Sequence, residues 1–289
     1  MFAIEASNLS NLCKAIVRQN QLDDVIEVIH GKVEEVVLPI KKADILISEW
    51  MGFYLLHEAM LNSVIVARDR WLGVDGLMVP STASIYLAPV QMTDYYKENF
   101  LFWTKAYGCD LSPIAQLVKE KSLSQPSILE VKEDYVLAEP ELVTHLDLMY
   151  VEANDLQTVL GSFGFNIKKN AVCHGFVCWF DCLFEGDEDV TLSTAPSAPS
   201  THWQQTVLFM PDAYFVNKGE TLGCQFKMTQ DEKIERRYNL SLEILEEESD
   251  SEEREAEMFD EEEEDEEQGE GIDKEQLRQA VMDTMQSHS

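Results

Sequence analysis

Hydrophobic and polar positions follow two different patterns along the chain, and the change falls near Pro80. Before Pro80, short apolar runs such as VIEVI and ADILI are separated by segments with helical periodicity. This alternation predicts a parallel sheet with crossover helices. After Pro80, runs such as STASIYLAPV, VCHGFVCWFDCLF and YNLSLEIL are short, alternate in polarity and are separated by turns. They predict an antiparallel barrel or sandwich that ends near residue 245.

One segment interrupts the predicted strands of the second part, at about residues 93–122. It is rich in aromatic residues (YYKENFLFWTKAYG), and its pattern is more helical than that of its neighbours. The residues leave two arrangements open. The segment packs into the core, or it projects as an arm that docks on another subunit.

Two glutamates, Glu49 and Glu58, bracket the loop SEWMGFYLLHEAML, residues 48–61. The run before it, ADILI, has the length and the β-branched content of a buried parallel strand, and helical periodicity runs from Glu58 through Trp71. The loop therefore lies at the carboxyl end of a strand, where open α/β sheets place their ligands.

Paired carboxylates could bind a divalent metal, act as the acid and base of a glycosidase, or hold a cation. A metal site needs further ligands, and only His57 lies within the loop. A glycosidase pair would face across a sugar cleft, but the intervening residues here are large and apolar. A guanidinium fits best, because its planar fork of donors matches carboxylates and its face packs on side chains such as Trp50 and Met51. A structural ion pair is the remaining alternative.

The formal net charge of the 289 residues is −32. Residues 246–289 hold 20 acidic and 3 basic residues, a net of −17, which leaves −15 for residues 1–245. An acidic body argues against direct binding of nucleic acid or acidic membranes, and it favours basic partners. The run from Glu246 to Gly271 has too few apolar residues to form a core, so we expect it to be disordered, with a possible short helix after it.

The six cysteines are too few for a disulfide scaffold and fit a reducing compartment. No apolar run reaches the roughly 18 residues of a membrane span, and no basic, apolar leader is seen, so we expect no membrane contact and a nuclear or cytoplasmic location. Cys173, His174, Cys178 and Cys182 have the look of a metal site, but they lack a second ligand pair at zinc spacing. We interpret them as part of a buried strand and expect no metal.

The loop SEWMGFYLLHEAML resembles the double-glutamate loop of the protein arginine N-methyltransferases, and THW, residues 201–203, resembles the second signature loop of that family. LSTAPSAPSTHWQQT and HGFVCWF are more similar to type I members, those numbered six and, less so, two. The resemblance covers about residues 1–245. It implies a doubly wound, Rossmann-like methyltransferase sheet over residues 1–80 and an antiparallel β-barrel over residues 81–245. The segment at about residues 93–122 then becomes a dimerisation arm, and the protein a homodimer.

The resemblance also implies a cofactor, S-adenosyl-L-methionine, and positions that bind it. Glu5 matches the carboxylate that binds the ribose hydroxyls, which agrees with the general use of an acid at a strand end. Val33 and Glu34 match the positions that hold the adenine. Met60 matches a thioether near the reacting methyl group.

The implied substrates are arginine side chains in basic proteins such as histone tails, with asymmetric dimethylarginine as the product. Glu49 and Glu58 match the pair that grips the substrate guanidinium, and Met51 matches a residue near the substrate. His202 matches the histidine of the THW loop, which could accept the released proton, and Trp203 matches its aromatic neighbour.

The chain departs from the family at its start, because the glycine-rich turn that binds the methionine part of the cofactor is not found in the sequence. The sheet would then lack a central strand and would expose the edges of its neighbours. Two interpretations remain. The sequence is part of an active arginine methyltransferase, or it is a truncated, catalytically inactive fragment that acts as a dimerising or histone-binding module.

Overall fold

The structure, a computed structural model, describes residues 1–245. The predictions for the acidic run and for a terminal helix concern residues 246–289 and lie outside the described residues. None of the helices in the described part is both long enough and apolar enough to span a membrane.

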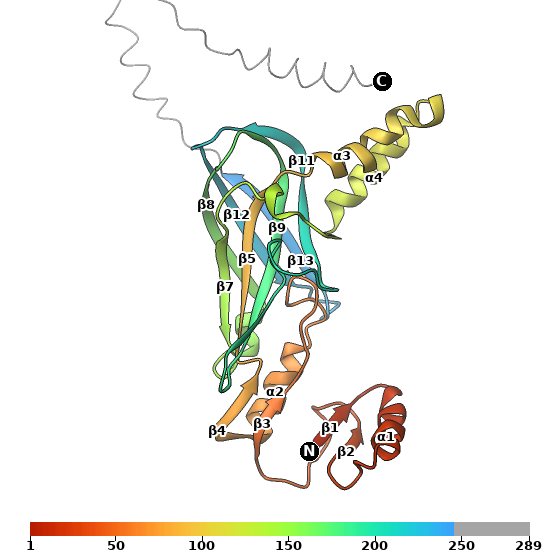
Figure 1. The fold of residues 1–289 in the computed structure, drawn as a ribbon, viewed down its shortest axis with the longest axis vertical. Coiled ribbons are helices and arrows are strands. Elements are labelled where there is room, and N and C mark those ends of the chain that lie inside the picture. The colour runs from red at the N-terminus through yellow and green to blue at the C-terminus, as the bar shows by residue number, and fades with distance from the viewer. Residues whose placement is uncertain (246–289) are drawn as a thin grey trace, which may run out of the picture. The chain divides into compact units, whose positions relative to one another are not determined.

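The first 79 residues form two βαβ units, each with its own two-stranded parallel sheet (Figure 1). The elements are β1 (Phe2–Glu5), α1 (Leu9–Gln19), β2 (Glu27–His30), β3 (Ala43–Ile47), α2 (Leu61–Trp71) and β4 (Leu72–Val79). β1 pairs with β2, and β3 pairs with β4. In the common doubly wound order 3-2-1-4-5, these pairs correspond to strands 3-2 and 4-5. Among the described residues no strand lies between them, which agrees with the prediction made from the missing glycine-rich turn.

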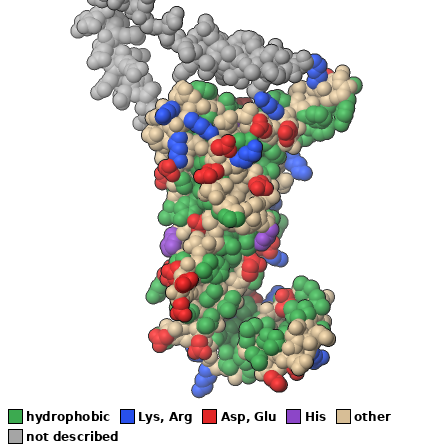
Figure 2. Space-filling view, in the orientation of Figure 1, with side chains coloured by type: hydrophobic (Ala, Val, Ile, Leu, Met, Phe, Trp, Pro, Cys, Tyr) green, Lys and Arg blue, Asp and Glu red, His purple; other side chains and the backbone are tan. Residues whose placement is uncertain are grey.

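The run ADILI forms β3, as predicted, but the prediction that this strand is buried is wrong. Ile45 and Ile47 are 52% and 73% exposed. The reason is that β3 has a paired neighbour, β4, on one edge only within residues 1–245. Helix α1 likewise exposes Leu9, Leu12 and Ile16, and Figure 2 shows hydrophobic side chains gathered on the surface of the first βαβ unit.

The second part consists of antiparallel strands in two sheets that share one core, as the alternating pattern predicted. The strands are β5 (Thr82–Val90), β6 (Ser127–Leu129), β7 (Glu141–Asp147), β8 (Thr158–Asn166), β9 (Ala171–Phe184), β10 (Val190–Ser193), β11 (Gln205–Val216), β12 (Thr221–Gln230) and β13 (Tyr238–Leu245). One sheet has the order β6-β11-β9-β5-β7, with β10 on β9, and the other has the order β13-β12-β8. Phe165, Phe176 and Phe226 are fully buried between them, so the sheets form the wall of an antiparallel barrel. Short 3-10 turns, η2 (Glu133–Tyr135) and η3 (Ala153–Leu156), join the strands around β7.

Strand β9 carries the cysteines that had the look of a metal site. Cys173, Cys178 and Cys182 are buried in the core, and His174 accepts a hydrogen bond from the backbone N–H of Met92 at 3.1 Å. The interpretation of this run as a buried strand is confirmed.

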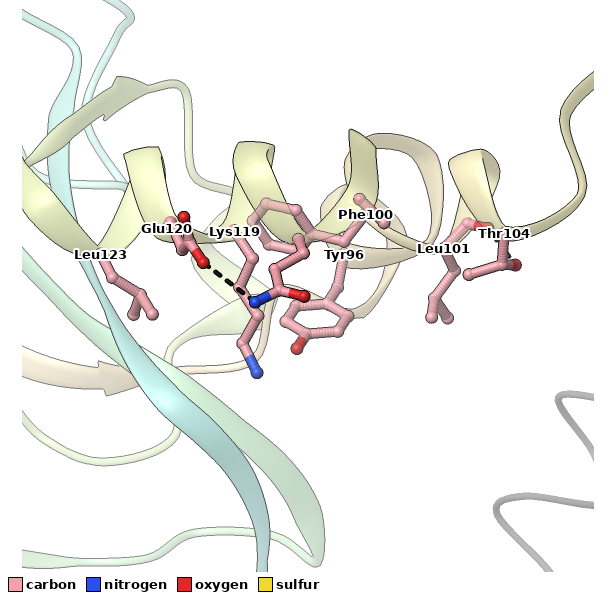
Figure 3. Close-up of a pocket in the computed structure, with 9 residues that line it drawn as sticks. Tyr96, Phe100, Leu101, Thr104, Lys119, Glu120 and Leu123 are labelled. Atoms are coloured by element: carbon pink, nitrogen blue, oxygen red, sulfur yellow. Dashed lines mark hydrogen bonds between the residues drawn. The ribbon is translucent and has the colours of Figure 1, made fainter. Parts of the chain in front are cut away.

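The segment between β5 and β6 is helical: it contains α3 (Thr93–Asn99), η1 (Leu101–Gly108) and α4 (Ser112–Ser124). Figure 1 shows α3 and α4 extending away from the strands. Between them lies a pocket of about 410 Å³ whose lining includes Tyr96, Phe100 and Leu123 (Figure 3). Of the two arrangements that the residues left open, the projecting one is found.

Helix α2 connects the two parts of the fold. Leu61, Val64 and Ile65 pack into the same hydrophobic core as the barrel strands. Arg68 donates hydrogen bonds from Nη1 to the backbone carbonyls of Leu148 and Val151, at 2.9 and 2.7 Å. The loop before α2, which holds the two glutamates, is thereby fixed against the barrel.

Candidate functional site

The double-glutamate loop, residues 48–61, has a buried middle and two exposed glutamates. The buried residues are Trp50, Met51, Tyr54, Leu55 and Leu56, all part of the barrel core. Glu49 and Glu58 both lie on the surface, and they flank this apolar stretch. The loop therefore presents two carboxylates to solvent from a rigidly packed base.

The backbone of this loop is tightly folded and requires glycine at one position. Gly52 and Leu55 exchange backbone hydrogen bonds at 2.9 and 3.0 Å, and Leu55 has a φ of +69°. A Cβ at Gly52 would lie 1.9 Å from the carbonyl oxygen of His57. No larger residue fits there without moving the backbone that leads to Glu58.

The helix after the loop begins later than its periodicity predicted. Periodic positions run from Glu58, but α2 begins at Leu61. Glu58 and Ala59 have φ values of +75° and +53°, a left-handed conformation that cannot start an α-helix. The shift places Glu58 on a strained turn beside the helix rather than on it.

A hydrogen bond joins the double-glutamate loop to the THW loop. The indole N–H of Trp203 donates to the backbone carbonyl of Met51 at 2.8 Å. Trp203 is buried and packs edge-on against Phe180, with ring centroids 5.6 Å apart. His202 is exposed, and its ring lies 3.8 Å from the ring of Trp203. Two segments about 150 residues apart in sequence thus meet at this site.

Tyr54 and His57 form a second polar contact within the loop. The Tyr54 hydroxyl and the His57 Nδ1 atom are 2.8 Å apart. Burial raises the pKa of Tyr54 to about 12 and lowers the pKa of His57 below its usual value of 6.5. Both groups are therefore neutral near pH 7, and the hydroxyl donates to the ring nitrogen.

An arginine that the sequence patterns did not single out contacts Glu58. Nη2 of Arg236 lies 2.8 Å from the Glu58 carboxylate, and the backbone N–H of Glu58 donates to the carbonyl of Arg236 at 2.8 Å. Arg236 lies in the turn between β12 and β13. The only sequence signal was the adjacent pair Arg236–Arg237 in that turn.

The candidate ribose ligand, Glu5, lies at the end of β1. Its Oε1 atom accepts a hydrogen bond from the backbone N–H of Ser7 at 2.6 Å, and this bond lowers the pKa of Glu5. His30 is its partner in the β1–β2 register. The other carboxylate oxygen of Glu5 forms no hydrogen bond with the described residues.

The candidate adenine ligands, Val33 and Glu34, follow β2 and lie against α2. Arg70 donates to the backbone carbonyl of Glu34 at 2.6 Å, and Ser63 donates to its carboxylate, which lowers the pKa of Glu34. Met60 is exposed and immediately precedes α2, three positions before Ser63. The structure thus brings Glu34 to the first turn of the helix that follows Met60.

A family model, the arginine methyltransferase oligomerization subdomain, matches residues 81–248. Among curated proteins, the chain is 34% identical over 278 residues to the probable protein arginine N-methyltransferase 6 of Arabidopsis thaliana, covering 84% of the chain and 64% of that relative. It is 39% identical over 227 residues to human protein arginine N-methyltransferase 2, covering 77% of the chain and 52% of that relative. The chain therefore spans between half and two thirds of the length of these two relatives.

Solved structures agree with the sequence relatives. A Trypanosoma brucei PRMT1 enzyme–prozyme heterotetrameric complex with AdoHcy is similar, with a TM-score of 0.76 and 31% identity over 86% of this chain and 77% of that one. The chain belongs to the protein arginine N-methyltransferase family.

Proposed function

We propose that the chain contains the guanidinium-binding site and the nucleoside-binding residues of a protein arginine N-methyltransferase that uses S-adenosyl-L-methionine. The observation that carries this proposal is the double-glutamate loop. Its apolar middle is buried in the barrel core, while Glu49 and Glu58 are exposed at either end of that middle. Two carboxylates on a fixed base suit a cationic, forked side chain.

The two glutamates act by distributing charge. An arginine guanidinium stays protonated in proteins, and its lone pairs are delocalised, so it is a poor nucleophile. Carboxylates at Glu49 and Glu58 draw the positive charge toward the nitrogens that they contact. The remaining terminal nitrogen then becomes the better nucleophile. His202, exposed beside Trp203, accepts the proton that this nitrogen loses.

Several residues fit the nucleoside part of the cofactor. Glu5 has a carboxylate oxygen available for ribose hydroxyls, and Glu34 is held at the start of α2 by Ser63. Met60 lies where that helix begins. When bound, the cofactor supplies an electrophilic methyl group on a sulfonium. Holding the acceptor nitrogen in line with that group lowers the barrier, because positioning alone can contribute several kcal/mol.

Charge and resemblance support a finer assignment of substrate and product. The net charge of −15 over residues 1–245 attracts arginine-rich segments such as histone tails. The similarity to members numbered six and two favours asymmetric dimethylarginine as the product. Histone substrates would place the protein in the nucleus and give it a role in chromatin regulation.

The experiment that tests the proposal has two steps, binding and then transfer. Calorimetry of the 289-residue chain with S-adenosylhomocysteine should give a dissociation constant in the micromolar range. Mass spectrometry of a histone-tail peptide should then show methylated arginine, which Glu49→Gln and Glu58→Gln abolish and Glu188→Gln, in an exposed turn, leaves unchanged. A folded chain that binds neither S-adenosylhomocysteine nor the peptide would overturn the proposal.

A second candidate function is a dimerising or histone-binding module without catalysis. The match of residues 81–248 to an oligomerization subdomain favours it. The exposed Leu117 on α4 gives the arm an apolar contact point for a second copy of the chain. The pocket between α3 and α4 (Figure 3) is lined by other residues of the arm. Leu117→Asp should convert a homodimer to a monomer in light scattering, whereas Leu160→Asp, exposed on β8, should not. Deleting residues 246–289 tests histone binding by that segment.

A further inference from the structure

Arg236 holds Glu58 through its side chain and its backbone together. Its Nη2 atom donates to Glu58 Oε2 at 2.8 Å, and its Nε atom donates to the Glu58 carbonyl at 3.2 Å. In return, the backbone N–H of Glu58 donates to the Arg236 carbonyl at 2.8 Å. Three hydrogen bonds therefore fix one residue that lies 178 positions away in the sequence.

These bonds compensate for an unfavourable backbone. Glu58 and Ala59 both have positive φ, which residues other than glycine adopt only when the surroundings impose it. The ion pair itself is solvent-exposed, with 73% of the Arg236 side chain and 55% of the Glu58 side chain accessible, so its direct contribution to stability is small. Its effect is to orient Glu58.

The turn that carries Arg236 is itself well defined. The Asp231 side chain accepts hydrogen bonds from the backbone N–H groups of Lys233 and Ile234 at 2.9 and 3.0 Å. The backbone N–H of Asp231 donates to the Arg237 carbonyl, and that of Arg237 donates to the Ile234 carbonyl, both at 2.8 Å. Arg236 is thus presented from a closed turn between β12 and β13.

The contact with the carboxylate uses one of its two oxygens. Arg236 binds Oε2, and Oε1 forms no hydrogen bond with the described residues. An arginine that merely occupied the place of a substrate would need only its guanidinium. Here the backbone of the same residue also takes part, which is typical of a structural support.

We propose that Arg236 is a positioning residue, which acts through Glu58 by fixing the carboxylate in the orientation that leaves Oε1 free for a second guanidinium. This inference rests on the proposed function only in that the second guanidinium belongs to the substrate. Lysine cannot replace it fully, because a single ammonium on a flexible stem does not reproduce the fork that reaches both the carboxylate and the carbonyl.

The test compares Arg236→Ala and Arg236→Lys with Lys233→Ala. That control removes the same charge from the same turn, at a residue whose side chain forms neither a hydrogen bond nor an ion pair with Glu58. Hydrogen exchange over residues 52–61 should be faster in Arg236→Ala and unchanged in Lys233→Ala. The affinity for the peptide Gly-Gly-Arg-Gly-Gly should fall about five- to tenfold in Arg236→Ala, the scale of one ordinary hydrogen bond, and less in Arg236→Lys.

A double variant separates action through Glu58 from a general effect of charge. In a Glu58→Gln background, Arg236→Ala should cause no further loss of peptide affinity. Equal or tighter binding of the peptide by Arg236→Ala would overturn the inference and make Arg236 a competitor of the substrate. An unchanged exchange rate over residues 52–61 would also overturn it. If the wild-type chain fails to bind the peptide while exchange still responds to Arg236→Ala, the proposed function fails and the positioning of Glu58 stands.

Discussion

The indole N–H of Trp203 donates a hydrogen bond to the backbone carbonyl of Met51 at 2.8 Å, although 152 positions separate the two residues. Both residues are buried, so the bond is shielded from water. It ties the THW loop to the double-glutamate loop at the point where the latter leaves β3. The position of His202 next to Trp203 is thereby coupled to the position of the two glutamates.

Replacing Trp203 by phenylalanine keeps an aromatic ring but leaves the Met51 carbonyl without its donor. Trp50→Phe is a matched control, because Trp50 is also buried and its indole N–H has no partner among the described residues. We expect Trp203→Phe to lower the free energy of unfolding by about 1–3 kcal/mol more than Trp50→Phe does. Urea denaturation of both variants measures the difference, and equal losses would show that the bond contributes nothing.

Gly52→Ala should distort the double-glutamate loop without unfolding the barrel. The new Cβ would lie 1.9 Å from the His57 carbonyl, so the loop must shift at a cost of about 1–3 kcal/mol. Because this shift also moves Glu58, the affinity for an arginine peptide should fall. In Gly186→Ala the nearest atom would lie 3.6 Å away, so that variant should match the wild type. Calorimetric titration of both variants checks this, and an unaffected Gly52→Ala would refute it.

Ile47→Thr should have little effect on folding stability. Ile47 is on β3, which pairs with β4 along one edge only, and its side chain is mostly exposed. We therefore expect the free energy of unfolding to change by no more than about 0.5 kcal/mol. Ile85→Thr, fully buried on β5, should cost about 1–3 kcal/mol because it buries a hydroxyl. The Ile47 variant should also aggregate more slowly in light scattering, since an apolar, open strand edge promotes association.

Acid should weaken the junction between β9 and the arm through His174. Burial lowers the pKa of His174 in the folded state below its usual value of 6.5, and its Nδ1 atom accepts the Met92 N–H. The unfolded chain takes up a proton near pH 6.5, before the folded chain does. Stability is therefore complete above that pH and is lost as the pH falls toward the folded-state pKa, by up to about 1.4 kcal/mol per pH unit for one proton.

The half-buried His57 has a pKa shifted in the same direction, so it also makes the protein less stable as the pH falls. His174→Phe should accordingly be less stable than the wild type at pH 8 but should lose less stability between pH 7 and pH 5. Guanidinium denaturation of the wild type and of His174→Phe at four pH values would measure how steeply the free energy of unfolding changes with pH in each. Parallel slopes would exclude His174 as a source of the acid sensitivity.

The sequence predicted the elements whose pattern is local. The alternation in VCHGFVCWFDCLF predicted β9 because alternate side chains of a strand point to opposite faces, whatever its neighbours are. ADILI predicts β3 through its length and its β-branched content, which are also local properties. Its exposure could not be predicted from the run itself, since burial depends on which strand lies at its other edge, and only the missing glycine-rich turn indicated that this edge is open.

The geometry of the site required information that no local pattern holds. Helical periodicity began at Glu58, but the left-handed φ at Glu58 and Ala59 delays α2 to Leu61. Hydrogen bonds with Arg236, a charged residue in the turn between β12 and β13, accompany that conformation. A contact between residues 178 positions apart cannot be predicted from the pattern of ten or twenty neighbouring residues.

The long separation of these contacts also has a consequence for biosynthesis. The double-glutamate loop leaves the ribosome before Trp203 and Arg236, which lie 152 and 178 positions after their partners. At translation rates of roughly 5–20 residues per second, the loop waits on the order of 10–35 seconds for Arg236. The nascent loop carries five apolar side chains that have no barrel to bury them during that interval. The site therefore cannot assemble until the β12–β13 hairpin has been made, and the apolar side chains of the early segment remain unburied until then.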